Sequence, residues 1–250
     1  MSGSDAAAVE LRHVTKRFGS RQVLDDISLA VAAGRSVCIL GRSGTGKSVA
    51  LKHMVGLLRP DAGQVLIEGE DITDMNSREL SRVRRRIGFL FQNAALFDSI
   101  SVGGNVAFPL QRHTALDRAA IRARVGELLL AVGLAREHDK MPADLSGGMR
   151  KRAGLARALA LDPAILLVDE PSAGLDPITA GEIDQLLVGL KQRAGTTLVV
   201  VTHNIPSART LADEIVFLHE GRIHARGSPD ELDRLPEPLV RAFMRSAGTG

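Results

Sequence analysis

Short apolar runs and helical patterns alternate along this chain. Five runs rich in β-branched residues predict strands in its first part, at residues 9–14, 23–31, 36–40, 65–68 and 87–91. Between them, apolar side chains recur every three or four positions from Lys47 to Leu58, which predicts a helix that ends at Pro60. Asn76 followed by Glu79 is typical of another helix start, with a capping box.

The middle of the chain, from Asn93 to about Leu145, has a helical pattern. Five apolar residues fall on one helix face: Ile121, Val125, Leu128, Leu129 and Val132. We interpret about residues 93–150 as an inserted helical subdomain.

Strands and helices then alternate. The predicted elements are helix 149–160, strand 165–169, helix 179–192, strand 197–202, helix 205–211 and a hairpin of 215–218 and 222–225. Such alternation favours a mostly parallel sheet covered by helices on both faces. The sequence thus predicts one α/β domain over residues 9–227, with a β-rich N-terminal subdomain.

The two ends of the chain lie outside this domain. Residues 1–8 lack an apolar signal region and predict a disordered tail. Ser228, Pro229 and Glu231 are typical of a helix start, so residues 228–250 predict a helical extension. Its apolar stripe from Leu239 to Met244 packs either on its own domain or on a sister ATPase or small regulator.

Composition narrows the class of protein. The 250 residues are 44% hydrophobic, enough for a full core, and the net charge of +3 is only mildly basic. The single Cys38 sits in an apolar run and reads as a buried hydrophobe. No apolar stretch approaches the roughly 20 residues that span a bilayer. We expect a cytosolic chain whose membrane role comes through a partner.

The segment from Gly41 to Ser48 carries the clearest chemistry. Its glycines free backbone N–H groups to wrap phosphates at a helix N-terminus. Lys47 supplies charge to the β- and γ-phosphates, and the Ser48 hydroxyl is a Mg²⁺ ligand. The segment predicts a nucleotide site.

Three more strand ends complete the predicted chemistry. Asp169 follows a buried strand, where an acid is costly unless a metal or hydrogen bonds offset its desolvation, so we expect it to hold Mg²⁺. Glu170 points the other way and is the candidate general base. His203 is expected beside the γ-phosphate, and Gln92 is expected to reach both Mg²⁺ and the attacking water.

The segment from Leu145 to Met149 has no role in an ordinary phosphate-loop enzyme. Ser146 predicts a helix N-cap, and Gly147 and Gly148 expose N–H groups toward an anion. Beside a complete phosphate loop, this turn predicts a composite site that a second subunit closes.

Together these motifs resemble those of the ATP-binding cassette (ABC) ATPases over residues 9–227. The resemblance implies a RecA-like P-loop core, an N-terminal antiparallel β subdomain, ATP and Mg²⁺ as cofactors, and a head-to-tail homodimer. The nucleotide-binding residues it implies are Phe18, Gly41, Arg42, Ser43, Gly44, Thr45, Gly46, Lys47, Ser48, Val49, Ser146, Gly147, Gly148, Met149 and Asp176. Phe18 stands where the family usually has Tyr, so selectivity among bases stays open.

A narrower resemblance rests on residues 46–49, 91–97, 105–110, 113–114 and 145–157. These segments are similar to the ATPases of Mla-type phospholipid transporters, which work with a membrane permease, an MCE lipid carrier and often a small STAS-domain protein. The resemblance implies an ATPase held at the cytoplasmic face of the inner membrane by its permease. The cargo and the direction of transport lie outside this chain.

Other functions stay open. A transporter motor for a small solute would carry the same motifs, and a regulatory protein could bind ATP without turnover. A cassette acting on nucleic acid would need phosphate contacts, for which the basic run Arg82, Arg84, Arg85 and Arg86 is the candidate. We interpret that run as a solvated face and expect no nucleic-acid partner.

Overall fold

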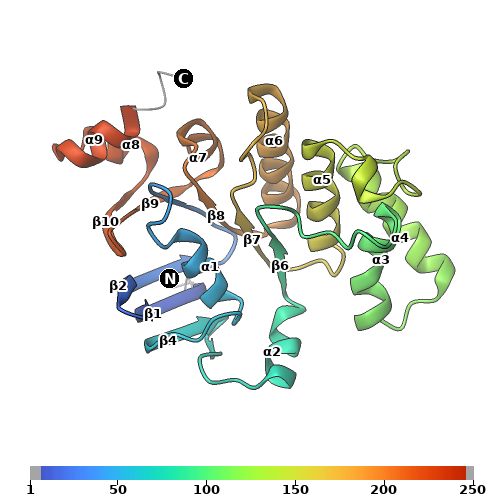
Figure 1. Cartoon of the computed structure of the whole chain (residues 1–250), viewed down its shortest axis with the longest axis horizontal. Coiled ribbons are helices and arrows are strands. Elements are labelled where there is room, and N and C mark those ends of the chain that lie inside the picture. Colours follow the sequence, from blue (N-terminus) through green and yellow to red (C-terminus); the bar gives the residue numbers. More distant parts are fainter. Residues whose placement is uncertain (1–6, 246–250) are drawn as a thin grey trace, which may run out of the picture.

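The computed structural model of the chain describes residues 7–245, except for the side chains of Arg193, Ala194 and Arg245. Its centre is a six-stranded sheet in the order β10-β9-β3-β8-β7-β6 (Figure 1). The strands are β3 (Ser36–Leu40), β6 (Ile87–Leu90), β7 (Ile165–Asp169), β8 (Thr197–Thr202), β9 (Glu214–His219) and β10 (Arg222–Gly227). Every neighbouring pair is parallel except β9 and β10, so the carboxyl ends of five strands meet at one edge.

A second sheet lies beside it, in the order β2-β1-β4-β5. It contains β1 (Ala7–Phe18), β2 (Arg21–Ala32), β4 (Ala62–Ile67) and β5 (Glu70–Asp71), and all its pairs are antiparallel. This sheet confirms the predicted antiparallel N-terminal part.

Helices cover both sheets and extend to one side. They are α1 (Lys47–Met54), α2 (Ser77–Arg84), α3 (Val102–His113), α4 (Arg118–Ala131), the 3₁₀ turn η1 (Pro142–Asp144), α5 (Gly147–Ala158), α6 (Pro177–Ala194), α7 (Ile205–Leu211), α8 (Pro229–Arg234) and α9 (Pro238–Arg245). Figure 1 shows α3, α4 and α5 grouped beyond β6, where the helical insertion was expected. Within residues 7–245, no helix is both long and apolar enough to cross a membrane.

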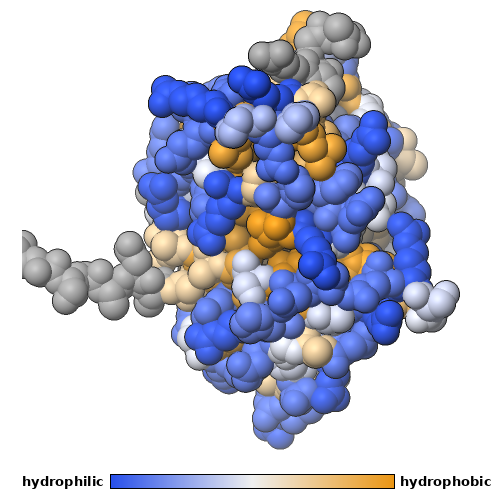
Figure 2. Space-filling view, turned by 90° about the vertical axis from the view of Figure 1, so that its left-hand side faces the viewer, coloured by the Kyte–Doolittle hydropathy of each residue, from blue (hydrophilic) through white to orange (hydrophobic). Residues whose placement is uncertain are grey.

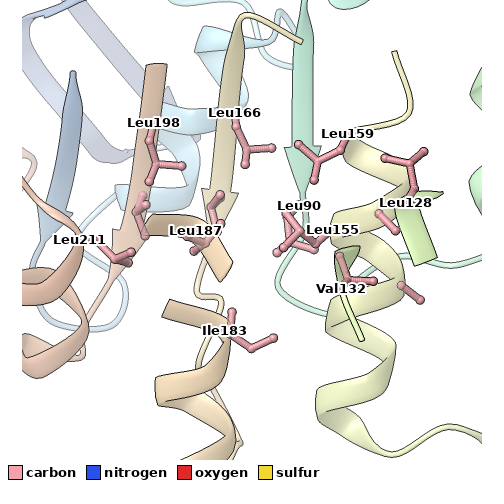
Figure 3. Close-up of a cluster of buried hydrophobic side chains, with 14 of the residues drawn as sticks. Leu90, Leu128, Val132, Leu155, Leu159, Leu166, Ile183, Leu187, Leu198 and Leu211 are labelled. Atoms are coloured by element: carbon pink, nitrogen blue, oxygen red, sulfur yellow. The ribbon is translucent and has the colours of Figure 1, made fainter. Parts of the chain in front are cut away.

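The core has two layers because side chains alternate across each strand. Leu166 and Val168 of β7 join the cluster formed with α3 to α7, whereas Ile165 and Leu167 join the cluster formed with α1 and the antiparallel sheet. Figure 3 shows the first cluster, with Leu155 of α5 among the side chains that fill it. Burial on both faces explains why these strands read as continuous apolar runs.

The structure corrects several predicted boundaries. β1 starts at Ala7, inside the predicted tail, and residues 1–6 lie outside the described part. α1 ends at Met54 instead of Leu58, because the chain turns at Gly56, which has a φ of 66°. The two-residue strand β5 was not predicted.

The C-terminal stripe packs on its own domain. Val240 and Met244 are buried in the cluster with α7, and the Phe243 ring lies 4.8 Å from the Phe217 ring. Arg209 donates to Asp233 of α8 at 2.6 and 2.8 Å. Figure 2 faces this end of the molecule, where hydrophilic residues surround a smaller apolar area.

Candidate functional site

The loop from β3 to α1 is built on glycines that approach other backbone closely. A Cβ on Gly41 would lie 2.4 Å from the Leu218 carbonyl oxygen. Gly46 caps α1 with a φ of 102°, and a Cβ there would meet the Val23 carbonyl at 2.7 Å. Only glycine fits both constraints, so the loop curls tightly and directs the first N–H groups of α1 toward its interior.

Lys47, the first residue of α1, points back into this loop. Its ammonium donates to the carbonyl oxygens of Gly41 at 2.9 Å and Arg42 at 3.0 Å, and lies 3.7 Å from Glu170 Oε1. Burial lowers the pKa of Lys47, and the neighbouring carboxylate of Glu170 opposes that shift. The result is a positive charge held where the loop narrows.

Asp169 ends β7 directly beside α1. The Ser48 hydroxyl donates to Asp169 Oδ1 at 2.8 Å. Burial raises the pKa of Asp169, while the hydrogen bond from Ser48 lowers it. The structure therefore brings together two of the three residues that the sequence assigned to a metal, Ser48 and Asp169.

Glu170 and His203 meet at the ends of adjacent strands. Asp169 pairs with Val201, so the residues that follow β7 and β8 face each other. Glu170 Oε2 lies 2.9 Å from Nδ1 of His203, and the Glu170 carboxylate is buried although the His203 ring is half exposed. Strand order predicted His203 at this edge of the sheet, beside the γ-phosphate, but its contact with Glu170 was not predicted.

Gln92 lies in the exposed turn that follows β6, the neighbour of β7. Arg157 of α5 fixes the same turn, donating to the carbonyl oxygens of Ala94 and Ala95 at 2.7 Å. Gln92 therefore stands at the same sheet edge as Asp169, on a loop that α5 holds.

Phe18 ends β1 as an exposed ring. Its side chain is 48% exposed, and the Lys16 ammonium lies 5.7 Å from the ring centroid. The ring keeps a face available for stacking on a planar group.

The turn at Ser146 belongs to a different wall of the molecule. Ser146 caps α5 by accepting from the Met149 N–H at 3.2 Å. A Cβ on Gly148 would lie 2.5 Å from Thr179 Cγ2, so this turn is seated on the start of α6. Asp176 caps α6 and accepts from the Thr179 hydroxyl at 2.6 Å. Figure 1 shows α5 and α1 on opposite sides of β7.

One buried cation at the site was not predicted. Lys151 of α5 is 6% exposed, and its ammonium donates to the Glu170 carbonyl oxygen at 2.7 Å. The only sequence signal is a lysine placed two positions before the buried Ala153 and four before the buried Leu155.

These features define a class of protein. A glycine loop that cradles anions, a buried cation inside it and an acid pair at the neighbouring strand end are the parts of a P-loop nucleotide hydrolase. The capped turn at Ser146, which lies on the other side of β7 from α1, is an addition to that plan.

Comparisons with known proteins name the family. The ABC transporter family profile matches residues 24–173. The intermembrane phospholipid transport system ATP-binding protein MlaF of Escherichia coli K12 is 41% identical over 250 residues, which cover 100% of this chain and 93% of that protein. The probable ribonucleotide transport ATP-binding protein mkl of Mycobacterium leprae is 44% identical over 243 residues, covering 97% of this chain and 70% of that protein.

Solved structures agree. The dimeric bacterial ABC transporter cassette MJ0796 superposes with a TM-score of 0.84 at 35% identity, covering 88% of this chain and 98% of that one. A dimer of the same cassette in a post-hydrolysis state with ADP and Pi gives a TM-score of 0.83 at 36% identity, with the same coverage. The chain belongs to the ABC transporter family, and it is an ATP-binding, ATP-hydrolysing subunit of that kind.

The seat of the Ser146 turn can be tested by a paired substitution. Gly148→Ala should lower the free energy of unfolding by about 1–3 kcal/mol, because the new methyl meets Thr179 Cγ2. Thr179→Ser removes the Cγ2 methyl of Thr179 but keeps the hydroxyl that donates a hydrogen bond to Asp176. The double variant should therefore regain most of the lost stability. Urea denaturation measures both changes.

Gly126→Ala is the matched control. Gly126 lies in α4 with nothing within 4 Å of a new Cβ, so this substitution should raise stability by about 1 kcal/mol. If Gly148→Ala were as stable as Gly126→Ala, the close packing of α5 on α6 would be wrong.

Proposed function

We propose that the loop from Gly41 to Val49 holds the phosphates of ATP and that Phe18 stacks on its base. The buried ammonium of Lys47 supports the assignment, because its present acceptors are loop carbonyls that phosphate oxygens can replace. The loop amides at the start of α1 would donate to the same anion.

The metal assignment follows from the donor set. Mg²⁺ prefers oxygen ligands and is usually bound through one or two carboxylates together with substrate phosphates. Ser48 and Asp169 offer such oxygens, with Gln92 as the further candidate. In the described residues, no group of three or more His, Cys, Asp or Glu side chains is arranged to hold a metal ion by itself. When bound, Mg²⁺ neutralises charge on the phosphates.

The Glu170–His203 contact carries the catalytic proposal. Glu170 accepts the proton of a water that attacks the γ-phosphorus, and the bond from that phosphorus to the ADP oxygen breaks. His203 orients the carboxylate through the 2.9 Å hydrogen bond and stays exposed enough to reach the γ-phosphate. Lys47 stabilises the charge that develops on the phosphate oxygens.

The position of the Ser146 turn supports a shared site. Cassettes of this family dimerise and work with a membrane permease. Because Ser146, Gly147 and Gly148 are fixed on α6 of their own chain, away from their own phosphate loop, we propose that they and Asp176 face the nucleotide of a second copy. Each ATP would then lie between two chains in a head-to-tail homodimer.

We further propose intermembrane phospholipid transport. Near-complete coverage of MlaF at 41% identity supports this cargo over the one named for mkl, of which the chain covers 70%. The partners would be a permease, an MCE lipid-binding protein and a small STAS-domain protein, with the ATPase at the cytoplasmic face of the inner membrane.

The permease would dock beside the Gln92 turn. A groove of about 370 Å³ lies there, with Phe97, Phe108 and Pro109 in its lining. The rings of Phe97 and Phe108 lie 4.9 Å apart and both are exposed, which suits an apolar anchor from a partner. A movement of the docked partner would reach Gln92 directly.

The basic run does not support a nucleic-acid role. Arg82 and Arg86 pair with Glu70, and Arg84 donates to the carbonyl oxygens of Val55 and Gly56 at 2.9 Å. Three of the four arginines are thereby engaged within the chain.

Glu170→Gln tests the catalytic proposal. The amide keeps the shape of the side chain but cannot take the proton, so the ATP turnover number should fall by about 10²–10⁴-fold. ATP binding should remain, and the variant should elute as an ATP-dependent dimer in size-exclusion chromatography. Turnover at the parent rate would show that Glu170 is not the base.

The cargo proposal is tested on the complex from native membranes. We expect the chain to purify with a permease and an MCE protein, and mass spectrometry to find bound phospholipid. Recovery with a soluble solute-binding protein and no lipid would contradict the cargo while leaving the ATPase proposal intact.

A further inference from the structure

The backbone of Glu170 is unusual for a residue that is not glycine. Its φ is 49°, in the left-handed region that L-residues rarely adopt. Such a conformation persists only where surrounding contacts enforce it. The contacts that hold this peptide therefore decide where the carboxylate points.

Both sides of Glu170 are tied by hydrogen bonds. Its N–H donates to the Val201 carbonyl at 2.8 Å, which continues the β7–β8 pairing by one residue. Its carbonyl accepts from the Lys151 ammonium at 2.7 Å and, at the longer distance of 3.3 Å, from the Ala173 N–H. Of the two bonds to the Glu170 carbonyl, the one from Lys151 is the shorter, and its donor is charged. Charged donors form the stronger hydrogen bonds.

Lys151 reaches this carbonyl from a separate element. It lies in the second turn of α5, the helix that Ser146 caps, and its side chain is buried. Burial lowers the pKa of Lys151, and the nearby carboxylates of Glu170 and Asp169 oppose that shift. A buried ammonium with one backbone acceptor is expensive, so its position beside Glu170 calls for a reason.

The choice of acceptor matters. Lys151 bonds the backbone of Glu170, whereas the carboxylate is left to His203 at Oε2 and approaches Lys47 at Oε1. The lysine therefore fixes the peptide without capturing the oxygens that would accept a proton.

We propose that Lys151 is a positioning residue for ATP hydrolysis: from helix α5 it clamps the carbonyl of Glu170 and holds the carboxylate in its working direction. The proposal rests on the role of Glu170 stated above. It also places the Ser146 cap and the donor to the Glu170 carbonyl on the same helix, α5.

The test compares steady-state ATP hydrolysis by three variants of the full chain. Lys151→Met keeps the length of the stem but removes the donor, so kcat should fall at least about ten-fold while KM for ATP changes less than about two-fold. Lys151→Gln keeps an N–H donor and should recover part of kcat. Lys191→Met is the matched control, because Lys191 pairs with Asp213 at 2.6 Å at the end of α6 and should leave kcat unchanged.

A second comparison separates positioning from general support. In the Glu170→Gln background, Lys151→Met should cause little further loss of the residual hydrolysis, since the lysine acts through the carboxylate. A further ten-fold loss there would overturn the proposal, and so would an unchanged kcat in Lys151→Met alone. ATP-dependent dimerisation of Glu170→Gln tests the proposed function without involving Lys151. A failure of the Lys151 proposal can therefore be told apart from a failure of the proposed function.

Should Lys151→Met not fold, Lys151→Leu decides, because leucine also lacks a donor for the Glu170 carbonyl. A kcat reduced at an unchanged melting temperature and KM supports the positioning role. A parent-like kcat contradicts it, whether or not the melting temperature changes.

Discussion

The parallel register of β3, β8 and β7 is the constraint on which the whole site depends. Leu40 pairs with Thr202 and Asp169 pairs with Val201, so the three strands end at one level. Residues far apart in sequence, from the phosphate loop to His203, are thereby brought to a single edge. A slip of one residue in β7 would exchange the faces of Asp169 and its neighbours and separate Asp169 from Ser48.

Burial of charge is the second feature that shapes the site. Two carboxylates, Asp169 and Glu170, and two ammonium groups, Lys47 and Lys151, are all nearly excluded from solvent. Each would be costly alone, but every acid here has a cation or a hydrogen-bond donor in reach. Removing one member leaves the others uncompensated, which explains why the site is best regarded as a unit.

Most of this arrangement could be predicted because it is written in local patterns. Strand ends at Leu40, Asp169 and Thr202 were predicted to the residue, and the capping boxes at Asn76 and Ser228 are present. What could not be predicted depends on tertiary approach. The turn at Gly56 and the contact of Lys151 with the Glu170 carbonyl produce no repeating pattern of apolar residues in the sequence. The strand β5 has only two residues, which is too short for such a pattern.

The central claim is that one chain carries only part of each ATP site, and mixing two damaged chains tests it most directly. Lys47→Ala disables the phosphate loop and Ser146→Arg blocks the Ser146 turn, so each homodimer should be inactive. In a mixed dimer both defects fall on one site and the other is intact, so single-turnover ADP formation should return after subunit exchange. A mixture as inactive as its parents, although mixed dimers have formed, would contradict the account.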